Sequence, residues 1–321
     1  MTGTPSLSVR VAETEALTPT VRRIRLVSTS GAALPLFSGG SHVVVNLPTP
    51  RGVLRNPYSL TSCPTDGSGY EICVQRSITS RGGSLYVHEA LNPGDTLDIS
   101  YPVNLFPLDR RARKHLFVAG GIGITPFLAM MQQLAQEGGA FELHYAMRSP
   151  ETGAARAAVE ARYGTSRVRT YVSSHGTRIS LPDLLEGQPL GTHLYVCGPS
   201  RLIDDVLLQA REAGWPDENV HSERFAAPPP GKPFVLELAR SGRSIQVGSH
   251  QSVLEAIEAA GLDAPNLCRG GACGQCETGV VACDGALEHH DHFLTPDERA
   301  GGRKFMICIS RIAGERLVLD L

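Results

Sequence analysis

The spacing of apolar residues changes twice along this chain of 321 residues, and each change predicts a different kind of domain. Residues 1–108 contain short alternating or β-branched runs, such as VRRIRLVS and HVVVNL, separated by turn formers such as DGSG and NPGD. Short alternating runs between turns are typical of an antiparallel barrel or sandwich. The first segment is therefore predicted to be all β.

Between residues 109 and 227 the apolar runs are separated by helical stretches. HLFVA precedes FLAMMQQLAQEGG, ELHYAMR precedes ETGAARAAVEARYG, and HLYVCG precedes SRLIDDVLLQAREAGW. Strands that alternate with helices predict a parallel sheet, and helices on both of its faces explain why the strands are largely apolar rather than alternating. We expect an α/β domain of the nucleotide-binding kind.

A proline-rich break, AAPPPGKP at about 226–233, cannot form a central strand and is interpreted as a linker. The third segment, 228–321, opens with PFVLELARSGRSIQV, which predicts two strands. SVLEAIEAAG predicts a helix that begins with a Ser252/Glu255 capping box and stops at Gly261, and VLDL predicts a last strand. The chain is thus expected to be multidomain.

Composition and charge narrow the class of protein. Apolar residues make up 41% and charged residues 19%, and the formal net charge is -2, which argues for a soluble globular protein with no general attraction to nucleic acid. The N-terminus lacks a basic start followed by an apolar run, and the most apolar window, 116–131, is broken by glycine and proline. We therefore expect no secretory signal, no membrane span and a cytoplasmic location.

Four of the eight cysteines lie within 268–283, a clustering that favours metal over disulfides in a cytosolic chain. Cys268, Cys273 and Cys276 form C-x4-C-x2-C, and Cys308 lies 32 positions beyond Cys276. This spacing matches plant-type [2Fe-2S] ligation, in which three thiolates share one loop and a distant fourth completes the set.

Glycines fill much of the rest of this loop and fit the same interpretation. Positive φ angles at these positions would let backbone N–H groups point at cluster sulfurs. The glycines concerned are Gly270, Gly271, Gly274 and Gly279. A structural zinc, a cluster of thiols without metal, and Cys283 instead of Cys308 as the fourth ligand stay open, although zinc sites usually pair two short knuckles.

Two turns predict a nucleotide site in the second segment. GGIGITP, 120–126, follows an apolar strand and opens a helix, where N–H groups and the helix dipole can hold a pyrophosphate. This turn lacks the full G-x-G-x-x-G form and is weak evidence alone. CGP, 197–199, also follows a parallel strand, at the carboxyl end where ligands sit in open α/β sheets.

Together these motifs resemble the phthalate dioxygenase reductase type family, a branch of the ferredoxin-NADP reductase superfamily that supplies electrons to Rieske-type oxygenases. The resemblance covers all three segments in the same order. It implies an FMN-binding antiparallel β-barrel at 1–108 and an NAD(P)-binding α/β domain at 109–227. The third domain, 228–321, would be an α+β plant-type ferredoxin of the β-grasp kind.

In the barrel, RNPYSL is similar to the R-x-Y-S-L motif that holds the flavin in this family. The resemblance implies that Tyr58, Ser59 and Leu60 belong to the flavin site, with Tyr58 and Ser59 along the isoalloxazine ring, and that Arg55 approaches the phosphate. One extra residue separates Arg55 from Tyr58, which departs from the family pattern. An ordinary barrel strand is the alternative reading.

Two further motifs are similar to flavin contacts of the family. SRGGS, 80–84, resembles its phosphate-binding turn, where an arginine charge and three amides would form an anion nest and favour FMN over FAD. SERF, 222–225, contains Phe225, which resembles an aromatic residue that packs on the flavin. The nest residues are Arg81, Gly82, Gly83 and Ser84.

For the coenzyme, the resemblance assigns Gly121 and Thr125 to the pyrophosphate and ring region. The nicotinamide side is assigned to Cys197, Gly198 and Pro199. NADH is expected by family habit, while SSHGTR, with its hydroxyls and Arg178 after the third parallel strand, leaves NADPH open. Ser59, near flavin N5, and Cys197 are the candidate catalytic residues.

Side chains around the cysteine loop carry two further expectations. His289, His290 and His292 in EHHDHF are expected to be solvated. Arg269, within the cysteine loop, is expected to be exposed and to contact a docking partner.

The expected activity follows from these cofactors. A hydride carries two electrons and a [2Fe-2S] cluster takes one, so a flavin must stand between NAD(P)H and the cluster. We expect the reductase component of a Rieske-type monooxygenase, dioxygenase or demethylase system, with the terminal Rieske oxygenase as partner and neither nucleic acid nor membrane involved. The alternatives are a self-contained reductase of a soluble acceptor and a non-enzymatic iron-sulfur sensor.

Overall fold

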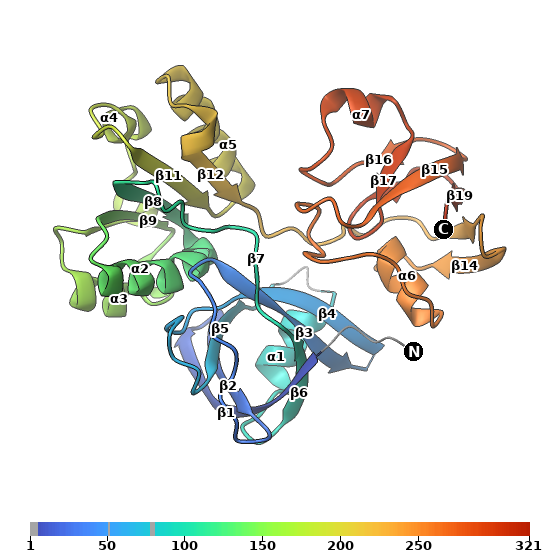
Figure 1. Ribbon diagram of the computed structural model, residues 1–321, viewed down its shortest axis with the longest axis horizontal. Coiled ribbons are helices and arrows are strands. Elements are labelled where there is room, and N and C mark those ends of the chain that lie inside the picture. Colours follow the sequence, from blue (N-terminus) through green and yellow to red (C-terminus); the bar gives the residue numbers. More distant parts are fainter. Residues whose placement is uncertain (1–5, 51, 78–80) are drawn as a thin grey trace. The chain divides into compact units, whose positions relative to one another are not determined.

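The computed structural model describes residues 6–50, 52–77 and 81–321. Its contacts divide the chain into two compact units, one up to Arg224 and the other from Phe225 to Leu321. The first unit contains an antiparallel and a parallel sheet, and the second contains the cysteine loop (Figure 1). A boundary between the barrel and the α/β domain at residue 108 stays a prediction.

The N-terminal sheet is antiparallel and curls into a barrel, as predicted. Its order is β4-β3-β6-β1-β2-β5, and β7 pairs with β3. The outer strands of this order meet again through a bridge between Leu60 and Ile72, which closes the barrel. The strands are β1 (Ser6–Thr18), β2 (Val21–Ser28), β3 (Ser41–Thr49), β4 (Gly52–Ser59), β5 (Tyr70–Gln75), β6 (Thr96–Ser100) and β7 (Val103–Asn104). Helix α1 (Gly83–Glu89) packs Val87 against the barrel core.

The second sheet is parallel, with the order β10-β9-β8-β11-β12. Its strands are β8 (Lys114–Gly120), β9 (Phe141–Met147), β10 (Val168–Val172), β11 (Thr192–Cys197) and β12 (Val220–Glu223). The helices between them are η1 (Gly121–Ile124), α2 (Thr125–Glu137), η2 (Pro150–Thr152), α3 (Arg156–Tyr163), η3 (Ser173–His175), α4 (Leu181–Leu185), α5 (Ser200–Glu212) and η4 (Asp217–Asn219). The strand order reverses between β8 and β11, the point at which ligands bind in open α/β sheets.

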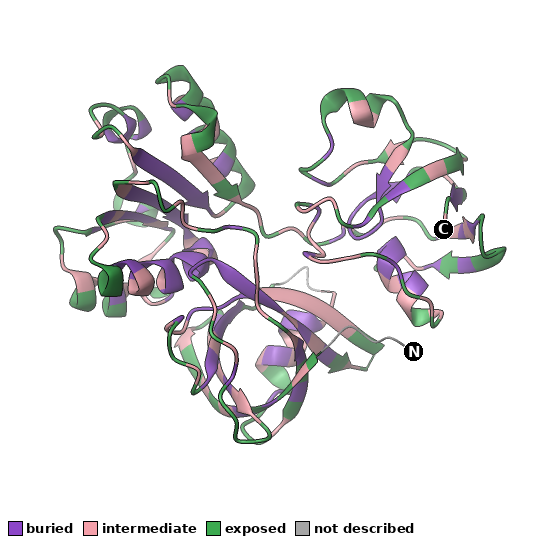
Figure 2. Cartoon of the chain, in the orientation of Figure 1, coloured by how far each residue is buried: buried purple, intermediate pink, exposed green. Residues whose placement is uncertain are grey.

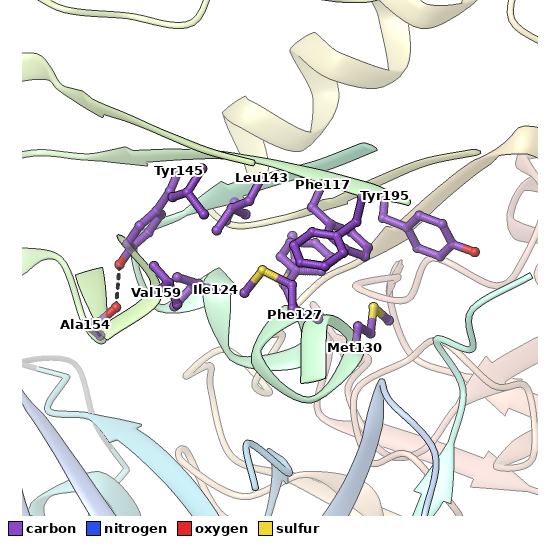
Figure 3. Packing of buried hydrophobic residues seen from close by; sticks show 14 of the residues in the cluster. Phe117, Ile124, Phe127, Met130, Leu143, Tyr145, Ala154, Val159 and Tyr195 are labelled. Atoms are coloured by element: carbon purple, nitrogen blue, oxygen red, sulfur yellow. Dashed lines mark hydrogen bonds between the residues drawn. The ribbon is translucent and has the colours of Figure 1, made fainter. Parts of the chain in front are cut away.

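Both faces of the parallel sheet are covered, because successive residues of β8 point to opposite sides. Phe117 packs with Phe127 of α2 on one face, where the ring centroids are 4.8 Å apart (Figure 3). Leu116 and Val118 pack with Ile203 of α5 on the other face. Two buried faces explain the continuous apolar runs in these strands, as the sequence predicted.

The C-terminal unit contains a sheet, two short helices and a long loop that holds three of the cysteines. Its strand order is β14-β13-β19-β15-β17, and β16 pairs with β18 separately. Helix α6 begins with Ser252, whose side chain accepts a hydrogen bond from the Glu255 amide, so the predicted capping box is confirmed. The elements are β13 (Phe234–Leu238), β14 (Arg243–Val247), α6 (Val253–Ala259), β15 (Glu277–Cys283), β16 (Leu287–Glu288), α7 (Pro296–Ala300), β17 (Lys304–Met306), β18 (Arg311–Ile312) and β19 (Arg316–Leu319).

Burial follows this arrangement of layers. The strands of the parallel sheet are mostly buried, whereas the outer sides of α5 and α7 are exposed (Figure 2). Within 6–50, 52–77 and 81–321, no helix has the length and apolarity needed to cross a membrane.

Candidate functional site

The four predicted cluster ligands come from one loop and one turn of the C-terminal unit. Cys268, Cys273 and Cys276 lie between α6 and β15, and Cys308 follows β17. The structure brings their sulfurs together as two hydrogen-bonded pairs, Cys268 with Cys273 and Cys276 with Cys308. The charge of Cys268 also acts on both sulfurs of the second pair, which puts the two pairs near each other.

Each pair holds one sulfur ready as the thiolate. The thiol of Cys273 and the backbone amides around it lower the pKa of Cys268 to about 5. Two of these amides, of Gly270 and Ala272, each donate to Cys268 Sγ at 3.4 Å. Cys308 lowers the pKa of Cys276 in the same way. Because the thiolate is the form that ligates metal, the loop is prepared to bind one before any metal is present.

Two thiol pairs supply the four thiolates that a two-iron cluster requires. In the described part of the chain, no three Cys, His, Asp or Glu side chains converge closely enough to hold one metal ion. A [2Fe-2S] cluster is held by four thiolates, two on each iron. Cys283, the alternative fourth ligand, lies on β15 opposite Leu317, and no other cysteine contributes to its raised pKa. These residues fit the cluster with Cys308 as the fourth ligand.

Two glycines of the loop are required where the backbone passes close to other groups. A Cβ on Gly271, where φ is 73°, would lie 2.9 Å from Asp291 Cα. A Cβ on Gly274, where φ is 76°, would lie 2.3 Å from the Phe293 ring. The expected positive φ is absent at Gly270 and Gly279, so that prediction was wrong for these two described positions.

Two other expectations near the loop are wrong. The Arg269 side chain is only 9% exposed and forms a buried ion pair with Glu258 of α6, so it does not face a partner. Its φ of 53° is one of the few positive values outside glycine among the described residues. The His289 side chain is 8% exposed and faces the buried Asp291, whereas His290 and His292 are exposed as expected. Arg269 is drawn inward by Glu258 of α6, whereas His289 faces Asp291 of its own segment.

The structure brings the two turns that were predicted to bind the nucleotide into contact at the carboxyl ends of β8 and β11. A Cβ on Gly123 would lie 2.3 Å from the Cys197 carbonyl oxygen, and a Cβ on Gly120 would lie 2.7 Å from Pro199 Cδ. Gly121, where φ is 54°, begins η1 and leads the chain into α2. The two turns therefore form one glycine-lined surface at the switch point of the sheet.

Thr125 and Cys197 are both buried at this surface. Thr125 Oγ1 donates to the Ile122 carbonyl oxygen at 3.0 Å. Burial keeps the pKa of the Cys197 thiol well above its ordinary value, and the nearby Glu223 carboxylate adds to this effect. Burial thus favours the thiol form of Cys197 over the nucleophilic thiolate.

Sequence reasoning missed Glu223, which lies opposite Cys197 in the pairing of β12 with β11. Its Oε2 is buried and has no hydrogen-bond partner among the described residues, and burial raises its pKa to about 8. A protonatable carboxyl beside the predicted nicotinamide turn is a candidate functional group. The sequence motif SERF contains Glu223, but only the register of β12 with β11 shows that Glu223 lies beside Cys197.

The flavin segment lies on β4, whose register with β3 is continuous from His42↔Ser59 to Thr49↔Gly52. Because side chains alternate along a strand, Arg55 and Ser59 share one face, and Asn56 and Tyr58 share the other. Asn56 Nδ2 donates to Tyr58 Oη at 3.2 Å. The extra residue in RNPYSL therefore places Asn56, not Arg55, beside Tyr58.

The same Asn56 reaches the predicted phosphate nest. A Cβ on Gly83 would lie 2.3 Å from Asn56 Nδ2, so the nest and β4 meet here. Ser84 is buried, and its Oγ accepts from the Ser77 amide at 3.1 Å. Arg81 and Gly82 precede α1, and Ser80 of the motif lies outside the described residues.

Phe225, expected against the flavin, is 50% exposed and is the first residue of the C-terminal unit. The flavin segment belongs to the other unit, so this contact stays a prediction. Leu60 is fully buried in the barrel core, where it helps to close the sheet.

Two family models match the chain. One, described as "Dimethylamine monooxygenase subunit DmmA-like, N-terminal domain", matches residues 101–220. The other, described as "2Fe-2S iron-sulfur cluster binding domain", matches residues 236–313, which include all four paired cysteines. The cluster interpretation of the loop is therefore supported independently of its geometry.

A solved structure of phthalate dioxygenase reductase is 35% identical to this chain, with a TM-score of 0.88 over 98% of each chain. The chain belongs to the phthalate dioxygenase reductase family. Its relatives in this family include the heme-dependent oxidative N-demethylase beta subunit of Ectopseudomonas mendocina, 48% identical over 98% of this chain and 99% of that protein. The carnitine monooxygenase reductase subunit of Acinetobacter baumannii is 43% identical over 97% and 96%.

Proposed function

We propose that this protein is the reductase component of an oxygenase or demethylase system. It passes electrons from NAD(P)H through FMN and a [2Fe-2S] cluster to a separate terminal protein. The observation that carries the proposal is the presence of two close thiol pairs in the same chain as the paired glycine turns at the switch point of a parallel sheet.

The residues of each site have defined tasks. When bound, FMN accepts a hydride and releases its electrons one at a time. The glycine turns admit the coenzyme backbone closely, and the neutral thiol of Cys197 leaves no charge beside the nicotinamide. Asn56 joins the FMN ligands expected from the sequence. The expected FMN ligands are Arg55, Tyr58, Ser59, Leu60, Arg81, Gly82, Gly83, Ser84 and Phe225. The proposed coenzyme contacts are Gly121, Thr125, Cys197, Gly198 and Pro199. The proposed cluster ligands are Cys268, Cys273, Cys276 and Cys308.

The proposed terminal partner is a Rieske-type oxygenase. A haem protein is the second candidate, because a relative 48% identical to this chain is named as a subunit of a heme-dependent oxidative N-demethylase. A cytoplasmic location is proposed as well, since all eight cysteines are free and suit a reducing compartment.

Reconstitution with a purified acceptor tests this function. The protein should be yellow-brown and release FMN on heating, and an anaerobic reduced coenzyme should bleach the flavin and iron-sulfur absorption together. Electron transfer to a Rieske oxygenase or to a haem demethylase should be much faster than to ferric chelates. Protein that contains zinc, or FAD, or that reduces ferric chelates fastest, would contradict the proposal.

A further inference from the structure

A buried carboxylate, Asp291, lies directly behind the cysteine loop, and the site described above gives it no task. Its side chain is 0% exposed. Gly271 belongs to the loop, between Cys268 and Cys273, and a Cβ on it would lie 2.9 Å from Asp291 Cα. The next amide along the chain, that of His292, donates to the Gly271 carbonyl oxygen at 2.9 Å. Asp291 is therefore packed against the backbone of the loop that carries three of the proposed ligands.

The same carboxylate also reaches the segment of the fourth proposed ligand. The Gly271 amide is a hydrogen-bond donor toward Cys308, and a Cβ on Gly271 would lie 2.8 Å from Ile309 Cγ2. The buried hydroxyl of Ser310, two residues after Cys308, donates to Asp291 Oδ1 at 3.5 Å. Asp291 thus contacts both ligand-bearing segments, and a single layer formed by Gly271 and Ser310 separates it from the ligands.

Hydrogen-bond donors surround both oxygens of this carboxylate. Asp291 Oδ2 accepts from the Phe293 amide at 3.2 Å and from the Leu294 amide at 2.9 Å, while Oδ1 accepts from the Ser310 hydroxyl. Donors on both oxygens favour the ionised form of a carboxyl group, because only that form is an acceptor at every lone pair. The layer behind the loop therefore carries a negative charge.

Two neighbours determine how much of this charge remains. His289 Nδ1 lies 3.6 Å from Asp291 Oδ1, but burial lowers the pKa of this histidine and so favours its neutral form. Arg299 Nη2 lies 3.6 Å from Asp291 Oδ2 and donates to the Asp291 carbonyl oxygen at 2.6 Å. The Arg299 side chain is 36% exposed, so water screens its charge more than that of the carboxylate. The compensation of Asp291 is consequently incomplete.

A fixed negative charge at this position bears directly on electron transfer. Reduction adds an electron to a cluster that four thiolates already make anionic, and a nearby buried anion disfavours that addition. We propose that Asp291 is a positioning residue of the cluster, which joins the Gly271 and Ser310 segments around the ligands and whose charge lowers the reduction potential of the cluster. A lower potential makes the reduced protein a stronger electron donor. The inference rests on the proposed function, because it requires the loop to hold a [2Fe-2S] cluster.

A redox titration of the intact holoprotein, followed by the EPR signal of the reduced cluster, tests this inference apart from turnover. Asp291→Asn keeps the size of the side chain and an oxygen that can accept from the two amides, but it removes the charge. One-electron reduction should become about tenfold more favourable, which is a rise of about 59 mV in the reduction potential. Iron per chain should stay at the wild-type value, because all four cysteines remain.

Two further variants separate a local charge from a general one. Asp297→Asn removes an exposed carboxylate from the first turn of α7 and should change the equilibrium constant for reduction less than twofold, because water and salt screen that charge. Arg299→Gln removes the partial counter-charge of Asp291 and should shift the potential in the opposite direction, downward.

The possible results lead to different conclusions. An unchanged potential in Asp291→Asn with full iron content would overturn the inference, and so would an equal rise in Asp297→Asn. If Asp291→Asn does not retain iron, Arg299→Gln decides, because a lower potential supports the inference and an unchanged one overturns it. Wild-type protein that is purified without any [2Fe-2S] cluster would instead contradict the proposed function, and the inference would fail with it.

Discussion

Buried ionisable groups of the two compact units have different surroundings. In the unit up to Arg224, burial lowers the pKa of His42 to about 4 and raises the pKa of Glu223 to about 8, which favours the neutral form of each. In the unit from Phe225, two buried ionisable side chains have hydrogen-bond partners on the backbone. Arg311 donates to three backbone carbonyl oxygens, and Asp291 accepts from the amides of Phe293 and Leu294.

The difference lies in what surrounds each group rather than in how deeply it is buried. In the first unit, His42 Nε2 and Glu223 Oε2 are buried without a hydrogen-bond partner among the described residues, because the strands that carry them use their N–H and C=O groups on one another. Loops of the second unit retain free N–H and C=O groups, which can replace water around a charge. The thiols show this most clearly, because Cys197 and Cys276 are both buried but their pKa values are shifted in opposite directions.

The largest effect is expected from the thiols. Cys276→Ser should abolish cluster binding, because a hydroxyl at this position does not ionise to replace the thiolate. Iron per chain and the visible absorption of the purified protein measure this loss. Cys283→Ser is the matched control and should retain the full iron content; a cluster lost in Cys283→Ser and kept in Cys308→Ser would reverse the assignment of the fourth ligand.

A large loss of stability is expected at Arg311. Its guanidinium binds the carbonyl oxygens of Gln251 at 2.6 Å, Lys232 at 2.8 Å and Gly248 at 3.2 Å. Arg311→Met leaves these buried acceptors without a donor and should lower the free energy of unfolding of the C-terminal unit by about 3 kcal/mol. Urea unfolding, followed by the absorption of the cluster, measures this loss of stability.

The control is an arginine of the same unit at the surface. Arg316 forms an exposed ion pair with Glu237 at 2.6 Å. Arg316→Met should lower the free energy of unfolding by less than about 1 kcal/mol, because exposed ion pairs contribute little to stability. Equal losses in the two variants would show that the buried arginine is not specially stabilising.

A smaller effect, dependent on pH, is expected at Glu223. Its pKa in the folded protein is about 8, above the ordinary value of 4.5, so between these values the folded chain holds a proton that the unfolded chain has released. The associated stability is fully present below pH 4.5 and is lost as pH rises to 8. Glu223→Gln should remove this dependence and be more stable than the wild type at pH 8.5. Thermal unfolding of both proteins across this pH range measures the difference. If stability depends on pH in the same way in both proteins, the carboxyl of Glu223 is not held neutral by the fold.

The smallest effect is expected at His221, which accepts or donates one ring hydrogen bond with His193 at 3.0 Å. Burial lowers its pKa from 6.5 to about 4, so the unfolded chain takes up the proton first as pH falls. Stability should therefore decline between pH 6.5 and 4. His221→Gln should reduce this decline.

Features that depend on neighbouring residues were predictable from the sequence. The capping box of α6 is set by residues three apart, and the apolar strands of the parallel sheet follow from a short repeating pattern. The cysteine loop could be recognised because three of its four ligands lie within nine residues, 268–276. The order of the three segments along the chain followed from these local patterns.

Features that depend on distant residues could not be predicted in this way. Arg311 is buried because acceptors 60 and 79 positions away surround it, and Arg269 is buried because Glu258 of α6 pairs with it. The role of Asn56 is an intermediate case. The alternation of a strand already indicates that it shares a face with Tyr58, but its approach to Gly83 needed the fold.

Strand β19 (Arg316–Leu319) lies between β13 and β15 in the middle of the C-terminal sheet, yet the ribosome makes it after every other described strand of that unit. The nascent chain thus carries all four cluster cysteines before the sheet that supports them can close. Domains of the first unit can fold during synthesis, whereas the sheet of the C-terminal unit can close only after β19 has been made. We expect the cluster to be inserted only once β19 is in place, and the thiols to be most vulnerable to oxidation before that step.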